Sequence, residues 1–241
     1  MGPADSLADP DCPTCKGLGV MRESADLFSP LVPCECSLAA RARRLEGLLS
    51  GKDGPAMSTA AVTFDSIIDR GVDGGFTRAM VGAAWDVQRG QVKMFTAWGT
   101  PGNAKTLVLQ ALVNQADPKL SRLYTTAERL MGWLRAGMGD ELDVENRMAL
   151  LRRVDVLALD EFEKAFGTRA DGSDKWGVAV LGELVGDRYS RGVESGEQVY
   201  TLLAMNASPE TLPPFLCSRI RDGRCRCVKN LDPDYRRVLE G

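Results

Sequence analysis

The sequence predicts an α/β domain preceded by a small cysteine-bearing module. The domain is predicted because short apolar runs of strand length alternate with helical periodicity, and because a glycine loop with a lysine joins one such strand to a helix. The module is predicted because two close pairs of cysteines lie within the first 36 residues. We expect the module and its linker to span residues 1–56 and the α/β domain to span residues 57–241.

The composition suits one medium-sized domain with a small appendage. The chain has 241 residues, of which 44% are hydrophobic, and this is enough for a substantial core. The net charge of −3 excludes a globally basic nucleic-acid-binding protein, so any contact with nucleic acid must come from a local patch. Because no apolar stretch approaches roughly 18 residues and the start of the chain lacks a signal sequence, we expect a cytoplasmic protein without membrane contact.

The first motif along the chain is a double pair of cysteines, Cys12 and Cys15 followed by Cys34 and Cys36. The first pair presents two thiolates to one metal ion, and the glycines just after it let backbone N–H groups approach the sulfurs. The second pair, although its C-x-C spacing is tight, completes a tetrahedral zinc site with a role in folding. A segment this short needs such a staple, since it cannot bury a core. The alternative is four unligated thiols. Histidine is absent, which excludes histidine ligands and histidine catalysis.

Two helices are predicted before the nucleotide motif. Residues 37–50 place leucines on one side and arginines on the other, and the turn-rich residues 51–58 are interpreted as a linker. A second helix is predicted for residues 76–89, with small apolar side chains along one face. It leads directly into the next strand.

Residues 92–106 are the stretch around which the chain is organised. Val92–Trp98 is rich in β-branched and aromatic residues and predicts a buried strand, and an apolar helix is predicted from Thr106 to Ala116. A strand, a glycine loop with a lysine, and a helix form the phosphate-binding arrangement of P-loop NTPases, in which backbone N–H groups and a helix N-terminus face an anion. The alternative is a glycine turn with an incidental lysine. The residues expected to bind ATP are Gly99, Thr100, Pro101, Gly102, Asn103, Ala104, Lys105 and Thr106.

Three positions of this loop carry specific expectations. Lys105 is expected to reach the β- and γ-phosphates, and the Thr106 hydroxyl is expected to bind Mg²⁺. Ala104 stands where the usual pattern has glycine. A Cβ atom in a left-handed backbone conformation costs roughly 1–2 kcal/mol, whereas a helical residue there costs nothing. We therefore expect ATP binding to survive and any effect of Ala104 to appear in the hydrolysis rate.

A second strand is predicted at residues 122–125, followed by two helical stretches within residues 127–153. Arg129, Trp133 and Arg135 lie on this insertion. An aromatic side chain among arginines can stack on a base of single-stranded DNA. The alternative is a tryptophan that is simply packed, which is the commoner role.

The apolar residues 154–159 predict a buried strand that ends in Asp160 and Glu161, the pattern of a Walker B motif. Asp160 is expected at the Mg²⁺ ion through water, and Glu161 is expected to orient and deprotonate the attacking water. The alternative is an acidic strand end in solvent. Because this pattern follows the P-loop by about fifty residues, the two together are more specific than either alone.

The next elements lead to a further polar position at a strand end. A glycine-containing loop over residues 166–175 precedes a helix over residues 176–189 and a strand over residues 198–204. Asn206 follows that strand and is expected beside the γ-phosphate, where an amide helps to polarise water. It could equally be a turn former.

The C-terminal part is predicted as a helix from residue 209 to residue 221 and a last strand at residues 226–229. Cys225 and Cys227 are interpreted as strand cysteines with one face buried. The stretch also holds five basic residues against one acid, and these form the strong positive cluster of this half of the chain: Arg219, Arg221, Arg224, Arg226 and Lys229.

Taken together, these motifs make the chain resemble bacterial and phage helicase loaders of the DnaC/DnaI type in the AAA+ superfamily. The resemblance covers essentially the whole chain. The nucleotide motifs alone are common to ATPases in general. The resemblance is restricted to this family by the cysteine-bearing N-terminus, which is joined to an ATPase core of this size without a lid. The other carriers are Leu157–Glu161, Asp187-Arg188-Tyr189, Asn206, Ser218-Arg219-Ile220 and Asp234-Tyr235-Arg236.

The resemblance implies an AAA+ P-loop core with a five-stranded parallel sheet flanked by helices, and a residue-127–153 insertion like that of initiators and loaders. It implies that Asn206 is sensor 1 and that Arg219, or failing that Arg221, is an arginine finger acting on the ATP of a neighbouring subunit. Such a finger contributes about 10³–10⁵ in rate. It further implies that the cysteine module docks on a hexameric DnaB-type helicase and that self-associated loaders open the ring over single-stranded DNA.

The sequence therefore predicts an ATPase that loads a DnaB-type replicative helicase onto single-stranded DNA during replication initiation, using ATP, Mg²⁺ and Zn²⁺. One alternative is a transposition helper related to IstB, which shares the core but acts on duplex DNA and a transposase. The cysteine module argues against it, because those helpers usually begin with a helical domain. The other alternative is an ATP-switched adaptor with little turnover, in which Ala104 has cost the enzyme its hydrolysis.

Overall fold

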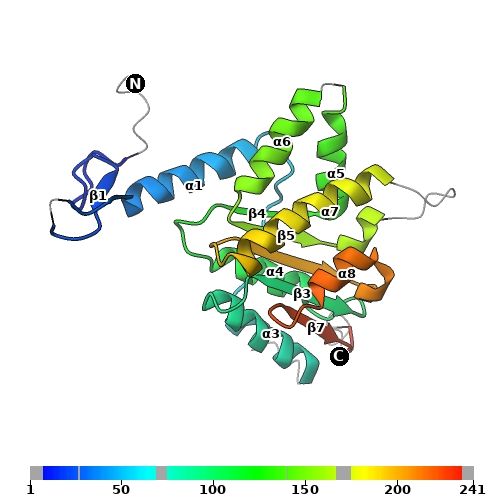
Figure 1. Ribbon diagram of the computed structural model, residues 1–241. Coiled ribbons are helices and arrows are strands. Elements are labelled where there is room, and N and C mark those ends of the chain that lie inside the picture. Colours follow the sequence, from blue (N-terminus) through cyan, green and yellow to red (C-terminus); the bar gives the residue numbers. More distant parts are fainter. Residues whose placement is uncertain (1–7, 27, 69–74, 140, 167–174, 235–241) are drawn as a thin grey trace.

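Figure 1 shows the computed structural model, which describes residues 8–26, 28–68, 75–139, 141–166 and 175–234. The main body is a five-stranded parallel sheet of order β4-β5-β6-β3-β7 with helices on both faces. This is the fold class that the sequence predicts. The strands are Met94–Gly99 (β3), Arg122–Thr126 (β4), Val156–Asp160 (β5), Tyr200–Met205 (β6) and Arg226–Asn230 (β7).

Both faces of the sheet are buried, which explains why its strands read as continuous apolar runs. Successive side chains point to opposite faces, so that Phe95 and Ala97 join one core cluster and Met94 joins the other. The first face is covered by Phe64–Ile68 (α2), Gly75–Gln88 (α3) and Lys105–Asn114 (α4). The second face is covered by Ala127–Ala136 (α5), Glu141–Arg153 (α6), Lys175–Tyr189 (α7) and Pro214–Ile220 (α8).

The register of the sheet brings the predicted motifs to one edge. Thr126 pairs with Asp160, Trp98 pairs with Met205, and Gly99 pairs with Asn230. The carboxyl ends of all the strands are therefore level, and this is the edge where ligands bind in open α/β sheets.

The N-terminal module is a short antiparallel hairpin of Val20–Arg22 (β1) and Leu31–Pro33 (β2), followed by the helix Glu35–Leu49 (α1). Leu45 and Leu49 of α1 are buried in the core of the main body. The following segment is also fixed, because the Pro55 carbonyl accepts hydrogen bonds from Thr125 Oγ1 at 2.7 Å and from Arg129 Nε at 3.1 Å. The division at residue 56 stays a prediction, and the helix that precedes it is anchored on the sheet.

The predicted helix over residues 209–221 is wrong in one respect, because it is broken. A 3₁₀ turn at Pro209–Thr211 precedes α8, and the two are separated at Pro213, whose ring removes a backbone donor and disfavours helical geometry before it. Of the predicted loop at 166–175, residues 167–174 lie outside the described residues. In the described part of the chain, no helix is long and apolar enough to cross a bilayer.

Arg188, part of the Asp187-Arg188-Tyr189 motif, has a structural position. Its side chain is 1% exposed and donates hydrogen bonds to the carbonyls of Val154 at 2.6 Å and Tyr200 at 2.7 Å. It thereby joins α7 to the starts of β5 and β6. Burial lowers the pKa of Arg188 to about 9, so the guanidinium stays charged near neutral pH.

Candidate nucleotide and metal sites

The loop between β3 and α4 has the backbone geometry of an anion-binding turn. Gly99 and Gly102 have φ angles of 135° and 80°, which favour glycine. A Cβ atom on Gly99 would lie 1.9 Å from the Asn230 carbonyl oxygen, so no other residue fits there. The loop ends at the N-terminus of α4, whose dipole favours an anion.

Ala104 adopts the left-handed backbone conformation, which strains a residue that has a Cβ atom, and not the helical one. Its φ of 68° and ψ of 8° are left-handed, at the residue that immediately precedes α4, and its side chain is buried. The Cβ atom is therefore strained by roughly 1–2 kcal/mol relative to an unstrained backbone. The loop keeps its shape because other contacts hold it.

Those contacts come from β7, which sequence reasoning did not connect to the loop. Asn103 Nδ2 donates to the Asn230 carbonyl at 2.6 Å, and Asn230 Nδ2 donates to the Asn103 carbonyl at 2.9 Å. Both side chains are almost fully buried. This reciprocal pair fixes the loop to the end of the neighbouring strand. An asparagine at a predicted strand end was the available signal.

Lys105 lies inside the loop. Its side chain is buried, and Nζ donates to the carbonyls of Gly99 at 2.9 Å and Thr100 at 2.6 Å and to Asn103 Oδ1 at 2.9 Å. The ammonium group thus bonds to three acceptor oxygens of the loop itself, and its contact with the β- and γ-phosphates stays a prediction.

The second motif meets the first at a cluster of oxygen atoms. Thr106 Oγ1 donates to Asp160 Oδ2 at 2.7 Å, and the Glu161 backbone N–H donates to Asp160 Oδ1 at 2.9 Å. Asp160 is buried. A hydroxyl and a carboxylate are hard oxygen ligands of the kind that Mg²⁺ prefers, so this pair fits the predicted metal.

Tyr124 of β4 also reaches this cluster and was not predicted. Its hydroxyl donates to Asp160 Oδ2 at 3.1 Å. Burial, and then the neighbouring Asp160 charge, raise the pKa of Tyr124 to about 12, so the hydroxyl keeps its proton near neutral pH.

Glu161 follows β5 with a positive φ of 52°. This backbone conformation is uncommon for residues other than glycine, and such residues cluster at functional sites. Its Oε1 atom accepts from Lys164 Nζ at 2.6 Å. This bond raises the pKa of Lys164. For Glu161 to deprotonate water as predicted, its carboxylate has to leave Lys164.

Asn206 directly follows β6 at the same edge, and its side chain is exposed. Its backbone N–H donates to Glu163 Oε1 at 3.0 Å. The other carboxylate oxygen of Glu163 is buried without a hydrogen-bond partner among the residues that the structure describes. The register pairs Leu159 with Leu203, so Asn206 lies beyond the level of Asp160 at the same edge of the sheet, and its role stays a prediction.

Three arginines of the basic cluster form ion pairs with carboxylates, and Arg219 is held in a different way. The paired arginines are Arg221 with Glu210, Arg224 with Asp222, and Arg226 with Asp86. Arg219 contacts the Phe215 carbonyl at 3.2 Å and lies 5.8 Å from the ring of Tyr189. Within the described part of the chain, no carboxylate pairs with Arg219. Of the two predicted finger candidates, it is therefore the one whose charge is not neutralised.

The three residues proposed for DNA stacking do not form one surface. Trp133 packs against the core, with the Arg147 guanidinium 5.0 Å from its ring centre, so the packed alternative describes it. Arg129 donates to the Pro55 carbonyl. Arg135 is exposed and lies 5.7 Å from the ring of Trp176 instead.

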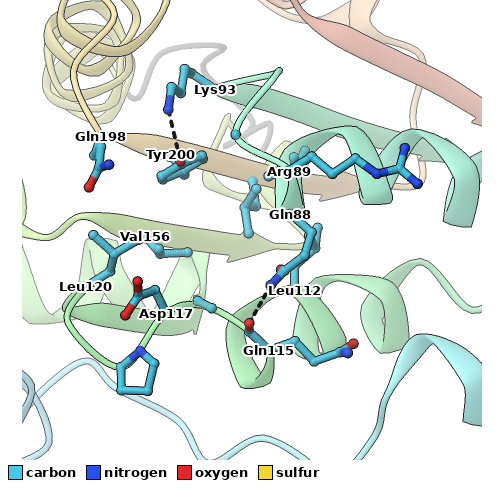
Figure 2. A pocket seen from close by; sticks show the side chains of 15 residues that line it. Gln88, Arg89, Lys93, Leu112, Gln115, Asp117, Leu120, Val156, Gln198 and Tyr200 are labelled. Carbon is cyan, nitrogen blue, oxygen red and sulfur yellow. Dashed lines mark hydrogen bonds between the residues drawn. The ribbon is translucent and has the colours of Figure 1, made fainter.

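A cavity of about 610 Å³ lies away from these motifs, at the amino-terminal edge of the sheet. Figure 2 shows Lys93 and Tyr200 pointing toward one another there, with Lys93 Nζ 2.9 Å from the Tyr200 hydroxyl. Gln88 on the other side donates to the Gln115 carbonyl. None of the predicted site residues lines this cavity.

The four predicted metal ligands come together in the N-terminal module. The sulfurs of Cys12, Cys15, Cys34 and Cys36 all lie within 4.8 Å of one another. The Cys12–Cys34 and Cys15–Cys36 sulfur distances are 3.8 Å and 3.5 Å. A tetrahedral ion with Zn–S bonds of about 2.3 Å separates its sulfurs by about 3.8 Å, so the cluster fits a zinc ion. As predicted for the glycines, the Gly19 N–H donates to Cys15 Sγ at 3.3 Å.

Comparison with known proteins rests on structure alone, because no protein-family model and no curated protein matches the sequence. Domain III of the Thermotoga maritima replication initiation protein DnaA matches 76% of the chain at a TM-score of 0.59 and 20% identity, and 73% of that domain is covered. Replication initiator DnaA bound to AMPPCP and single-stranded DNA matches 72% of the chain at 0.58 and 18% identity. AMPPCP-bound DnaA from Aquifex aeolicus matches 74% at 0.56 and 18%.

The chain therefore shares the fold of these replication initiator domains, a five-stranded parallel sheet flanked by helices. The chain spans about half the length of the two nucleotide-bound DnaA chains, 51% and 53%. Identities this low establish the fold and leave function to be argued from the site.

We predict that Ala104→Gly stabilises the protein by about 1 kcal/mol, because glycine removes the left-handed strain of alanine and only part of that gain is lost to its greater freedom in the unfolded chain. Ala111→Gly, within the following helix α4, is the matched control. Ala111 is helical and fully buried. It should lose at least about 1 kcal/mol. Urea unfolding of both variants measures the difference, and equal signs would contradict the strain assignment.

We predict about one zinc ion per chain in reduced, freshly purified protein. Cys36→Ser should lower the zinc content well below that of the wild type and expose the hairpin to proteolysis, because four thiolates hold the module together. Cys217→Ser, outside the cluster, should change neither. Elemental analysis and limited proteolysis check both variants, and a zinc content near zero in the wild type would refute the site.

Proposed function

We propose that this protein is an ATPase of the AAA+ type that loads a DnaB-type replicative helicase onto single-stranded DNA. The observation that carries the proposal is the meeting of Lys105, Thr106 and Asp160 at one edge of the sheet, in a chain that also bears a four-cysteine cluster. The fold shared with replication initiators supports a role in replication initiation. The cysteine module supports loading of a partner, because it lies outside the nucleotide site.

Bound ATP and Mg²⁺ would supply the γ-phosphoryl group and the positive charge that stabilises its transfer. The Lys105 ammonium would bind phosphate oxygens, while Thr106 and Asp160 would hold the metal through oxygen atoms. Glu161, once it has left Lys164, would accept the proton of the attacking water, and Asn206 would orient that water. Each of these residues lies at the carboxyl ends of adjacent strands.

Arg219 would complete the site of a neighbouring subunit. A finger has to keep its charge available for another chain's phosphate, and Arg219 differs in this respect from the arginines that pair with carboxylates. Ring contacts to Tyr189 and Phe215 would hold its guanidinium at the surface of α8. Self-association of the protein follows from this assignment.

The N-terminal module would hold zinc and dock on the helicase. Four protein ligands leave no open coordination position, so this zinc would serve folding rather than catalysis. Exposed apolar side chains on the hairpin and its loop are available for a partner: Leu18, Met21, Phe28 and Leu31. The same module argues against the transposition helper.

A second candidate function is an ATP-switched adaptor with little turnover. Two observations favour it: Ala104 is left-handed in the loop, and Glu161 is paired with Lys164. Either feature would slow hydrolysis while leaving the nucleotide bound.

We predict that Glu161→Gln lowers ATP hydrolysis at least about 100-fold and keeps ATP binding, because the amide cannot accept a proton. Lys105→Ala should abolish binding. Glu194→Gln, at an exposed position away from the site, is the control. Turnover and nucleotide affinity are measured with and without single-stranded DNA. Unchanged nucleotide affinity in Lys105→Ala would refute the nucleotide site. If the wild-type protein binds ATP tightly but does not hydrolyse it, the protein is the adaptor.

We predict that Arg219→Ala loses about 10³-fold or more in hydrolysis rate if it acts in trans. Mixing it with Glu161→Gln protein should restore activity, since one variant keeps the catalytic glutamate and the other keeps the arginine. Arg224→Ala, whose side chain pairs with Asp222, is the matched control and should change the rate little. Mixtures without recovery would exclude a finger at this position. Co-purification with a replicative helicase rather than a transposase then distinguishes the loader from the transposition helper.

A further inference from the structure

The candidate magnesium ligand Asp160 is held by more than the two nucleotide motifs. Its Oδ2 atom accepts from the hydroxyls of Thr106 and Tyr124, and its Oδ1 atom accepts from the Glu161 N–H. A carboxylate offers about four acceptor positions. Three are used by the protein, which leaves one direction for a metal or a metal-bound water.

Tyr124 reaches Asp160 because of the register of the sheet. Tyr124 pairs directly with Ala158, and Asp160 is the diagonal neighbour two residues further along β5 on the same face. Diagonal neighbours are about 7–8 Å apart, a gap that an aromatic side chain with a terminal hydroxyl spans and a short polar one does not. The ring of Tyr124 packs among apolar residues of the core, so a phenylalanine would fill the same space.

We propose that Tyr124 is a positioning residue for the magnesium ion, because its hydroxyl orients the Asp160 carboxylate. This inference rests on the proposed nucleotide site. The carboxylate can rotate about its Cβ–Cγ bond when only Thr106 and one backbone donor hold it. The Tyr124 hydroxyl removes that freedom, because it adds a third hydrogen bond to the carboxylate.

The test is a Mg²⁺ titration of nucleotide binding by Tyr124→Phe, followed with a fluorescent ATP analogue. The half-saturating Mg²⁺ concentration should rise about 5–20-fold, in the range that loss of an outer partner of a metal ligand produces. Affinity in EDTA should change less than about twofold, because the phosphate contacts of the loop are intact.

Tyr200→Phe is the matched control, since its hydroxyl contacts Lys93 at the opposite edge of the sheet. It should leave the Mg²⁺ dependence unchanged. A Tyr124→Phe titration that coincides with the wild type, or an equal loss of affinity with and without Mg²⁺, would overturn the positioning role. A wild-type protein that binds no nucleotide in either condition would instead refute the proposed function together with this inference.

Discussion

The hydrogen bond from Thr106 to Asp160 is the contact on which the candidate site depends. It joins the first turn of α4 to the last residue of β5, and so brings together two motifs that are 54 residues apart. The bond is possible because β6 separates β3 from β5 by a single strand and all three end at the same level. Parallel pairing therefore brings the loop that holds Lys105 to the same edge of the sheet as Asp160.

The two outer strands of the sheet, β4 and β7, support the contact between Thr106 and Asp160 from opposite sides. On one side, the Asn230 amide of β7 fixes the phosphate loop and offsets the strain of Ala104. On the other, Tyr124 of β4 holds the carboxylate of Asp160. Asn230 and Tyr124 have no predicted chemical role, but they hold the residues that do. Both are buried polar side chains with satisfied hydrogen bonds.

The sequence predicts the parallel core well because its elements are signalled within a few neighbouring positions, and the candidate site residues are named from the same short motifs. The strand, glycine loop and helix around Lys105 need no distant information, and neither do the two cysteine pairs. The supports of the site are different. Asn103 and Asn230 are 127 residues apart, and the Tyr124–Asp160 bond depends on strand register, which a single sequence does not specify. Likewise, the three-residue strands of the hairpin are too short for a periodic pattern, and they lie beside the cysteine cluster.

One end of α1 is fixed on the main body, so a change in the angle of this helix would move its other end. Its last turns are buried against the sheet, the segment after it is bonded to β4, and the cysteine cluster lies at its far end (Figure 1). A helix of 15 residues is about 22 Å long, so a tilt of about 10° at its base would swing the module through an arc of about 4 Å. Such a swing would also have to break the ion pair between Glu35, at the start of α1, and Lys119 of the main body, whose Oε1 and Nζ atoms are 2.6 Å apart.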